Sequence, residues 1–370
     1  MPVSTGLETR DATTRRRPGD PSRPVRVAVV GATGYVGAEL VRLLSRHPNV
    51  EIVGLVGRDR SDVPVERTHP HLSTTGLTVD AERPESDAVF LALPHGTAAK
   101  LVGEIVADGT AVIDLGPDFR LRDPADYPTW YGFEHPIPAL LDQAVYGLPE
   151  LHRQELRDLV DRSVAIVGSP GCYPTTTLLA LAPLARAGLI GDLVVDAKSG
   201  ISGAGREAKP ELMFGEVNES VKAYGLGGHR HVAEIEQELA ILSPESSGNP
   251  GASGVDFLPH LIPMTRGILA TCHVRPTRPV GQEELDEIYA AAYDDEPFVT
   301  VVGAPPATKH VSGSNDVRVH VRHDARTGRI VVIAVLDNLV KGAAGQAVQA
   351  FNLVHGLPET AGLTQLPLSP

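Results

Sequence analysis

The residue best suited to nucleophilic chemistry in this 370-residue chain is Cys172. It follows an apolar run, 164–168, that is typical of a buried strand, and it precedes a segment, 176–182, that is typical of a helix. Pro174 suits a first helical turn, where its missing N–H is not needed. Cys172 is therefore expected at a strand-to-helix turn, where unpaired N–H groups favour the thiolate and lower a cysteine pKa. The alternative is a buried structural cysteine.

A second set of chemically capable side chains is the pair His229 and His231, which precedes a predicted helix at 232–242. A His-x-His pair can bind a metal ion, but no third ligand lies at a usual spacing, so we predict no metal. We expect His231 to be the acid–base catalyst and His229 to be its neighbour, although the sequence hardly separates the two. The alternative is a pair of surface histidines.

A glycine-rich turn lies between a predicted strand, 25–30, and a predicted helix, 38–44. Glycines in this position let the backbone approach a pyrophosphate held at the helix N-terminus. We therefore predict dinucleotide binding rather than a mere tight turn. The expected contact residues are Gly31, Thr33, Gly34, Tyr35, Val36 and Gly37.

The end of the second predicted strand, 50–56, bears on which dinucleotide binds. Arg58 stands where an acidic residue would contact the ribose hydroxyls of NAD, and an arginine accommodates the 2′-phosphate of NADP. NADP (NADPH) is the predicted cofactor, although the adjacent Asp59 argues the other way.

Strands and helices then alternate, with strands at 88–93 and 110–115 and a helix at 97–107, which predicts a doubly wound parallel sheet of the α/β class. Ligands bind beyond the carboxyl ends of such strands. There Pro94 is expected to contact the cofactor. Arg120 is expected either to bind a substrate carboxylate or to pair with Asp118 or Asp123.

The second half of the chain has a different pattern. A strand at 193–198, four more at 257–264, 267–275, 317–323 and 330–337, and a helix at 282–293 predict an α+β domain with a mixed or antiparallel sheet. The last two strands are joined by a hairpin turn at 325–328. Residues 243–254 form a loop insertion without evident chemistry.

Composition limits the possible partners and the compartment. A net charge of -13 argues against nucleic acid and anionic membranes as partners. Two cysteines cannot form a disulfide framework, and no apolar run reaches membrane-spanning length, so a cytoplasmic protein is expected. Residues 1–24 are polar and are predicted to be a disordered tail. A transit peptide is the less favoured alternative, because acidic residues interrupt its basic character.

Four separated motifs resemble those of the N-acetyl-gamma-glutamyl-phosphate reductases of the semialdehyde dehydrogenase superfamily. The segment 170–175 is similar to their active-site signature, and the semialdehyde dehydrogenases share the G-x-x-G-x-x-G spacing. The segment 229–235 resembles their His-Arg-His-x-Pro-Glu-Ile motif, with Ala233 in place of proline. The segment 337–348 resembles their C-terminal signature. The resemblance covers nearly the whole chain from residue 25.

The resemblance implies NADPH-dependent reduction of N-acetyl-gamma-glutamyl phosphate, through a thioester on Cys172, to the semialdehyde and phosphate, as in arginine biosynthesis. It also implies a homo-oligomer, a dimer or a tetramer. By resemblance the nucleotide domain is 25–171, completed by a C-terminal helix at 338–357, and the catalytic domain is 172–337. The implied cofactor contacts are Ser199, Gly200 and Asn338, and the implied substrate contacts, with Arg120, are Ser202, Gly203 and Arg206.

Other functions stay open at this stage. A homologue of the lysine pathway acting on N-acetyl-aminoadipyl phosphate would carry the same motifs, because its substrate differs by one methylene. A thiol hydrolase or acyltransferase would use the Cys–His pair without needing the glycine-rich turn. A non-catalytic dinucleotide-binding regulator would need the turn but not Cys172.

Overall fold

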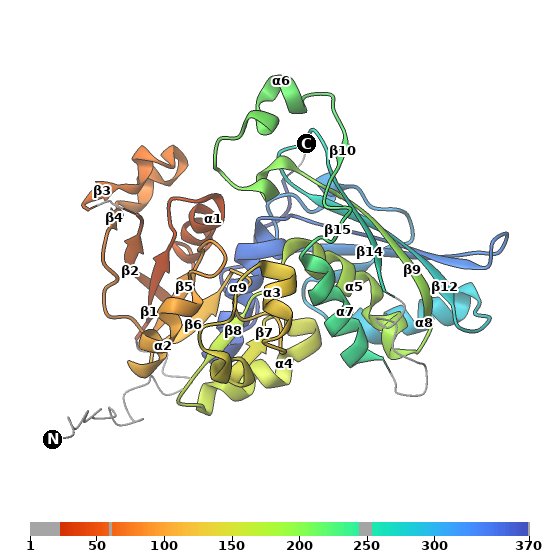
Figure 1. Cartoon of the computed structure of the whole chain (residues 1–370), viewed down its shortest axis with the longest axis horizontal. Coiled ribbons are helices and arrows are strands. Elements are labelled where there is room, and N and C mark those ends of the chain that lie inside the picture. The colour runs from red at the N-terminus through yellow and green to blue at the C-terminus, as the bar shows by residue number, and fades with distance from the viewer. Residues whose placement is uncertain (1–22, 59–60, 244–253, 369–370) are drawn as a thin grey trace.

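The computed structural model describes residues 23–58, 61–243 and 254–368 (Figure 1). Almost all of the predicted tail, Asp59 and most of the 243–254 insertion lie outside these residues. The described chain forms two lobes, each built on one β-sheet (Figure 1). None of its helices combines the length and the apolar character needed to cross a bilayer.

The first lobe contains an eight-stranded sheet in the order β3-β4-β2-β1-β5-β6-β8-β7. Neighbouring strands are parallel except for β3 with β4. Apolar side chains cover both faces, which explains the continuous apolar runs of the central strands. The strands are β1 (Val25–Val30), β2 (Val50–Val56), β3 (Val63–Pro64), β4 (Thr78–Asp80), β5 (Ala88–Leu91), β6 (Ala111–Asp114), β7 (Ala144–Tyr146) and β8 (Ile166–Gly168).

Helices lie on both faces of this sheet. Residues of α1 (Tyr35–Leu44) and α9 (Gly345–Val354) belong to the core on one face, and residues of α2 (Ala99–Ala107) and α3 (Asp126–Tyr131) to the core on the other. The helix α4 (Pro149–Asp158) packs against α9.

The second lobe contains a seven-stranded sheet in the order β10-β11-β9-β12-β15-β14-β13. It is mixed and mostly antiparallel, since only β11 with β9 and β13 with β14 run parallel. The strands are β9 (Ile190–Ser199), β10 (Lys222–Ala223), β11 (Asp256–Leu261), β12 (Ile268–Pro276), β13 (Val299–Val301), β14 (Val317–Asp324) and β15 (Arg329–Leu336). Together the two sheets confirm the predicted fold class.

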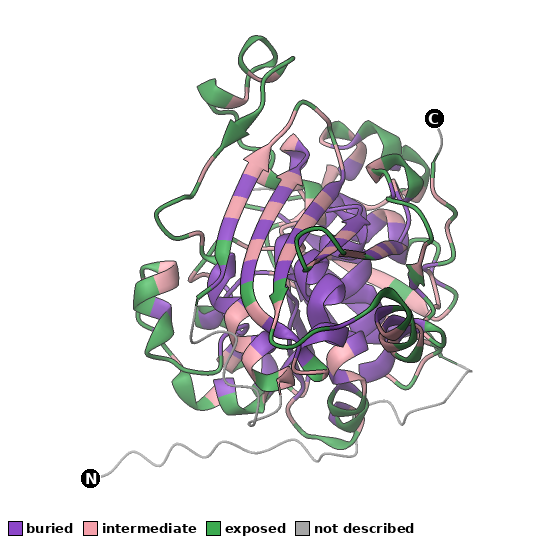
Figure 2. Cartoon of the chain, turned by 90° about the vertical axis from the view of Figure 1, so that its right-hand side faces the viewer, coloured by how far each residue is buried: buried purple, intermediate pink, exposed green. Residues whose placement is uncertain are grey.

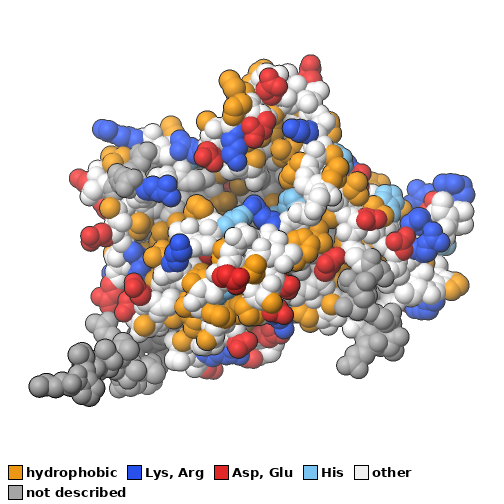
Figure 3. Space-filling model, in the orientation of Figure 1, with side chains coloured by type: hydrophobic (Ala, Val, Ile, Leu, Met, Phe, Trp, Pro, Cys, Tyr) orange, Lys and Arg blue, Asp and Glu red, His pale blue; other side chains and the backbone are white. Residues whose placement is uncertain are grey.

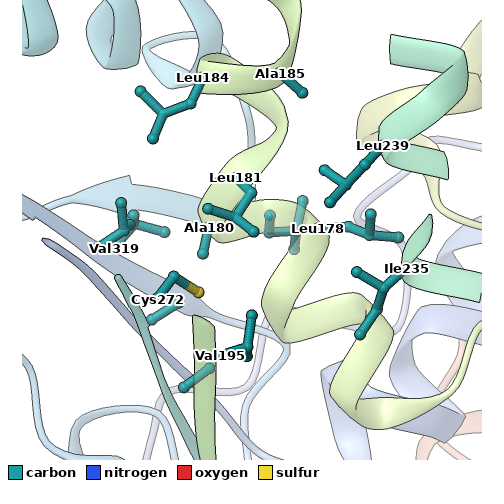
Figure 4. Packing of buried hydrophobic residues seen from close by; sticks show 14 of the residues in the cluster. Leu178, Ala180, Leu181, Leu184, Ala185, Val195, Ile235, Leu239, Cys272 and Val319 are labelled. Carbon is teal, nitrogen blue, oxygen red and sulfur yellow. The ribbon is translucent and has the colours of Figure 1, made fainter. Parts of the chain in front are cut away.

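One face of the second sheet packs on α5 (Cys172–Arg186), α7 (His231–Leu242) and α8 (Gln282–Tyr293). Figure 4 shows Ala180 and Leu181 of α5 beside Cys272 of β12 in this core. Cys272 is fully buried and is therefore structural. Buried and half-buried positions alternate along these strands, so the other face of the sheet is only half-buried, and Figure 2 shows no helix of the described residues over it.

The chain passes between the lobes at α5 and again after β15. The helix α5 follows β8 of the first sheet directly, yet its side chains belong to the core of the second. Near the end of the chain, α9 returns to the first lobe, where Phe351 packs on Phe90 at 5.3 Å between ring centroids. The domain limits at 171 and 172 stay predictions.

Several element boundaries differ from those expected. The helix at the cysteine is longer than 176–182, because it begins at Cys172 and continues past Pro183. The closing helix is divided in two, because a π-helical turn, η11 (Val340–Ala344), precedes α9. The helix at 282–293 and the strand at 50–56 match the expected ranges, and Gly328, with φ of 69°, closes the expected hairpin.

Candidate active site

Cys172 is the first residue of α5, directly beyond the carboxyl end of β8. The intervening turn is fixed at both ends. The Ser169 N–H donates to the Asp114 carbonyl of the neighbouring strand at 2.8 Å, and the Thr175 N–H donates to the carbonyl of Gly171, the N-cap, at 2.9 Å. The Cys172 side chain is half-buried. A methyl group at Gly342 would lie 2.8 Å from its Cβ, so the η11 backbone packs directly against the cysteine.

The pKa of Cys172 is not lowered as we expected from its helix position. Burial raises the pKa of the thiol to about 11, and this effect outweighs the Tyr173 N–H and the positive charge of Arg120, both of which lower it. The thiol is therefore protonated near neutral pH, and a base must remove its proton during the reaction.

His231 is the first residue of α7 and lies against the turn that carries Cys172. A methyl group at Gly171 would be 2.5 Å from Nε2 of His231, so only glycine admits this approach. Burial, together with the charges of His229 and Arg120, lowers the pKa of His231 well below its ordinary value. The imidazole is therefore neutral, with one ring nitrogen whose lone pair can take a proton, and the same lowering of its pKa makes it a weak base while the site is empty of substrate. Its buried Nδ1 has no hydrogen-bond partner within the described chain.

His229 lies beside His231, with 4.7 Å between the ring centroids, and its Nδ1 accepts a hydrogen bond from the His231 N–H at 3.2 Å. Burial and the charge of Arg230 lower the pKa of His229 to about 4. Arg230 also donates to Nδ1 of His95 at 3.3 Å, which links this loop to the first lobe. Among the described residues, no group of three or more His, Cys, Asp or Glu side chains is placed to hold a metal ion.

Glu234 joins these residues, although the sequence analysis gave it no role. Its fully buried carboxylate accepts the Gly171 N–H and the Tyr146 hydroxyl on Oε2, each at 3.0 Å. Its Oε1 accepts Nη1 of Arg120 at 3.0 Å. The spacing of three residues from His231 places both side chains on one side of α7, and that spacing could have identified Glu234.

Arg120 pairs with Glu234 rather than with either of the aspartates considered from the sequence. Its Nε donates to the Ser169 carbonyl at 2.7 Å and its Nη2 to the Leu115 carbonyl at 2.8 Å. Asp118 instead accepts the backbone N–H groups of Gly96 and Ala99. The guanidinium thus spans the strand-end loops around Cys172, and its contact with a substrate stays a prediction.

The glycine-rich turn has a geometry that fits a dinucleotide. Gly31 has φ of 88°, and a methyl group there would lie 2.2 Å from the Ala92 carbonyl oxygen. A methyl group at Gly37 would lie 2.3 Å from the Gly31 carbonyl oxygen, so α1 can pack on the turn only because of glycine. Gly34 is the N-cap of α1, no side chain caps the first N–H groups, and a methyl group at Gly34 would meet only the Gly31 carbonyl oxygen, at 3.6 Å. A helix start of this kind can hold a pyrophosphate on its unpaired N–H groups.

The remaining predicted cofactor residues surround this turn. Gly57, at the end of β2, lies against Thr33, with 3.0 Å between the position of an added methyl group and Cγ2 of Thr33. The exposed Arg58 follows directly. Pro94 is exposed beyond the end of β5. Arg206, from the second lobe, donates to the Thr33 carbonyl at 3.4 Å.

The loop 199–206 and Asn338 meet behind the glycine-rich turn. The Asn338 amide donates to the Ser202 hydroxyl at 2.9 Å and accepts the Gly267 N–H at 2.8 Å. A methyl group at Gly203 would lie 3.0 Å from Oγ of Ser199, so this loop is tightly packed. The structure thus brings Ser199, Ser202, Gly203 and Asn338 together.

A cavity of about 880 Å³ opens between α1 and this loop, and it is lined by Tyr35, Ser202 and Arg206. Its volume is within the range of small-molecule sites. Figure 3 shows the surface hollowed between the lobes, with histidine and basic side chains beside the hollow.

Two family models match the chain. "Semialdehyde dehydrogenase, NAD binding domain" covers residues 26–159, and "Semialdehyde dehydrogenase, dimerisation domain" covers residues 172–338. The chain belongs to the semialdehyde dehydrogenase family. The family expected from the sequence motifs is therefore confirmed, and the first lobe of this semialdehyde dehydrogenase is its NAD(P)-binding part.

Relatives of this semialdehyde dehydrogenase are similar over nearly their whole length. The N-acetyl-gamma-glutamyl-phosphate reductase of Heliobacterium modesticaldum is 48% identical over 363 residues, which cover 94% of this chain and 100% of that protein. The reductase of the same name from Desulforudis audaxviator is 48% identical over 349 residues, covering 92% and 98%.

Solved structures confirm the fold at lower identity. Aspartate semialdehyde dehydrogenase II of Vibrio cholerae, complexed with ASA, has a TM-score of 0.67 at 20% identity and covers 90% of this chain and 98% of its own. The aspartate semialdehyde dehydrogenase of Candida albicans, with NADP, has a TM-score of 0.67 at 18% identity and covers 90% and 99%.

Proposed function

We propose that this chain is an N-acetyl-gamma-glutamyl-phosphate reductase, which reduces that acyl phosphate to N-acetylglutamate 5-semialdehyde and phosphate, as in arginine biosynthesis. The observation that carries the chemistry is the approach of a neutral His231 to the Gly171–Cys172 turn at the start of α5. The near full-length similarity to reductases of this name supports the substrate.

The first half of the reaction is acyl transfer to the cysteine. Neutral His231 accepts the proton of the Cys172 thiol, and the thiolate attacks the acyl carbon. The bond between the acyl carbon and the phosphate oxygen breaks, phosphate leaves with the proton that His231 held, and a thioester remains on Cys172. The Gly171 N–H donates to the Glu234 carboxylate, which keeps the turn in place while the sulfur loses its proton and bonds to the acyl carbon.

The second half is reduction of the thioester. NADPH, when bound, supplies the hydride to the thioester carbon. The oxyanion that results is stabilised by a proton that His231 takes up from solvent. When the carbonyl re-forms, the carbon–sulfur bond breaks, and His231 returns its proton to the Cys172 thiolate. One hydride and one proton are consumed, and the resting thiol is restored.

The residues for NADP are proposed on the same basis. The backbone of Gly34 and the start of α1 would hold the pyrophosphate, Arg58 the 2′-phosphate, and Asn338 the nicotinamide. Arg58→Ala should raise the KM for NADPH by about ten- to a hundredfold, since a charge-assisted phosphate contact is lost, and should barely change that for NADH. Equal effects on both cofactors would show that Arg58 does not bind the 2′-phosphate.

The assignment is tested in both directions. NADPH oxidation measured with N-acetyl-gamma-glutamyl phosphate and with N-acetyl-aminoadipyl phosphate decides between the two substrates, and Cys172→Ser should abolish the reaction. In reverse, aldehyde and NADP should give sustained NADPH only when phosphate or arsenate accepts the acyl group. Sustained NADPH formation in phosphate-free buffer would refute the acyl-phosphate reaction.

We also propose a homo-oligomer, a dimer or a tetramer. The description of the 172–338 family model as a dimerisation domain supports it, as does the face of the second sheet that no helix covers (Figure 2). Light scattering coupled to gel filtration measures the mass directly, and a monomer at assay concentrations would contradict this proposal.

A further inference from the structure

Lys341 is a fully buried lysine in the π-helical turn η11, which packs against Cys172. The proposed reaction gives it no role. Its ammonium donates to Oε1 of Glu150 at 2.5 Å and to Oε1 of Gln349 at 2.6 Å. Glu150 comes from α4 and Gln349 from α9, and both side chains are fully or almost fully buried. A lysine is buried so completely only when its charge is compensated.

The same lysine lies within η11, the only π-helical turn of the described residues. In this turn each N–H donates to the carbonyl five residues earlier instead of four. The Gly342 N–H donates to the Asp337 carbonyl and the Ala344 N–H to the Leu339 carbonyl, both at 2.9 Å. A π-turn holds one residue more than an α-helical turn and is frequent at functional sites.

The turn positions two parts of the site. Gly342, next to Lys341, packs against Cys172, and Asn338, at the start of the segment, contacts Ser202. The carboxylate of Asp337 caps the turn by accepting the Leu339 N–H at 2.9 Å. At its other end the turn is connected to α4 by the ion pair between the Lys341 ammonium and Glu150.

We propose that Lys341 is a positioning residue: its buried ion pair with Glu150 holds the π-turn so that Gly342 supports Cys172 and Asn338 stays over Ser202. This inference rests on the proposed function of Cys172. Within the described residues the polar partners of the Lys341 ammonium are Glu150 and Gln349, and neither belongs to the proposed catalytic or cofactor residues, so Lys341 acts through the backbone of η11.

The test compares Lys341→Met with the double variant Lys341→Met/Glu150→Gln in a Cys272→Ala background, which leaves Cys172 as the single thiol. The single variant leaves the Glu150 carboxylate buried without its cation, so Tm should fall by several degrees. The double variant removes that charge as well, so Tm should recover. Exposed Lys309→Met is the matched control and should change nothing.

Two readouts separate positioning from stability at a temperature where circular dichroism shows each variant folded. We expect kcat to fall by about ten- to a hundredfold in both Lys341 variants, because a displacement of about 1 Å has that effect. We expect iodoacetamide to alkylate Cys172 faster in both, because Gly342 no longer covers it. Gln349→Leu, which removes the second acceptor, should show smaller changes of the same sign and serves if Lys341→Met does not fold.

An unchanged kcat and alkylation rate in the folded single variant would overturn the inference, as would recovery of both together with Tm in the double variant. The proposed function fails separately, if the parent enzyme does not oxidise NADPH with either acyl phosphate. In that case the alkylation rates still decide whether Lys341 positions Cys172.

Discussion

The reactive side chains are tuned by burial more than by charge. Burial raises the pKa of the Cys172 thiol to about 11 and lowers that of His231, so both groups are neutral near pH 7. The Cys172 thiol can then pass its proton to the His231 imidazole when a bound substrate lets the thiolate react with its acyl carbon. The helix N-terminus, which we expected to dominate, is too weak to offset desolvation of the sulfur.

Alkylation of Cys172 by iodoacetamide should therefore be slow at pH 7 and rise about tenfold per pH unit up to about pH 10, because the thiolate fraction grows below the raised pKa. The Cys272→Ala variant leaves Cys172 as the single thiol, so the measured rate is that of Cys172. Burial also raises the pKa of Cys272 to about 12, so we expect the wild-type rate to be the same. A rate that is already at its plateau at pH 7 would mean that the thiolate is preformed.

Glu234→Gln should lower kcat by about ten- to a hundredfold while the enzyme stays folded, because the amide keeps the shape but its charge no longer holds Arg120 and the Gly171 N–H. Steady-state kinetics measures this loss. Glu236→Gln, on the same helix, is a control that should keep kcat within about twofold, since only a part-buried hydrogen bond that Glu236 accepts from the Val255 N–H is affected. Equal kinetics for the two variants would contradict the role given to Glu234.

At the scale of elements, the site is made by helix starts that meet strand ends. The first residues of α5 and α7 place Cys172 and His231 in contact with one glycine, and α1 begins at the glycine-rich turn. Each approach depends on the absence of a side chain, at Gly171, Gly31 or Gly342. Glycine at these points is therefore a geometric requirement of the site.

Gly31→Ala should greatly destabilise the first lobe or abolish NADPH binding, because the methyl group would overlap the Ala92 carbonyl and φ is 88°. Gly109→Ala is the matched control. It also has a positive φ, of 78°, but an added methyl group meets nothing within 4 Å, so only the backbone cost of about 1–2 kcal/mol applies. NADPH fluorescence titration and thermal melts compare the two, and equal effects would contradict this account.

Elements with a local signal could be predicted from the sequence, and those that depend on distant partners could not. The strand β2 and the helix α8 match their expected ranges because their apolar patterns are set within the segment itself. The π-turn at 340–344 could not be foreseen, since it depends on Glu150 and Cys172 far away in the chain. The same holds for Arg120, whose partner Glu234 belongs to the other lobe.

At the scale of the whole molecule, the two lobes are joined by charges as well as by α5. Arg153 of α4 donates to Glu296, beyond α8 in the second lobe, at 2.9 Å and to Glu359, beyond α9, also at 2.9 Å. All three side chains are partly buried, which limits screening by solvent and salt. The interface between the lobes is therefore held by ion pairs as well as by the chain connection.

Arg153→Gln should lower the free energy of unfolding by about 1.5–3 kcal/mol, because two partly buried carboxylates lose their common partner. The melting temperature measured by calorimetry should fall by several degrees. Arg278→Gln is the control, since its pair with Glu284 is exposed and should contribute little. Equal shifts of the melting temperature for the two variants would show that the Arg153 ion pairs stabilise the fold no more than an exposed ion pair does.

The return of α9 to the first lobe has a consequence for how the chain folds as it leaves the ribosome. All ten residues of Gly345–Val354 are buried, and they cover one face of a sheet whose strands are synthesised first. The part of that face that α1 does not cover stays open to solvent until nearly the whole chain has been translated, so the second lobe can complete its core before the first. Ribosome-bound chains that stop before residue 345 should therefore be unusually sensitive to proteases and chaperones at the dinucleotide lobe, even though it is the N-terminal one.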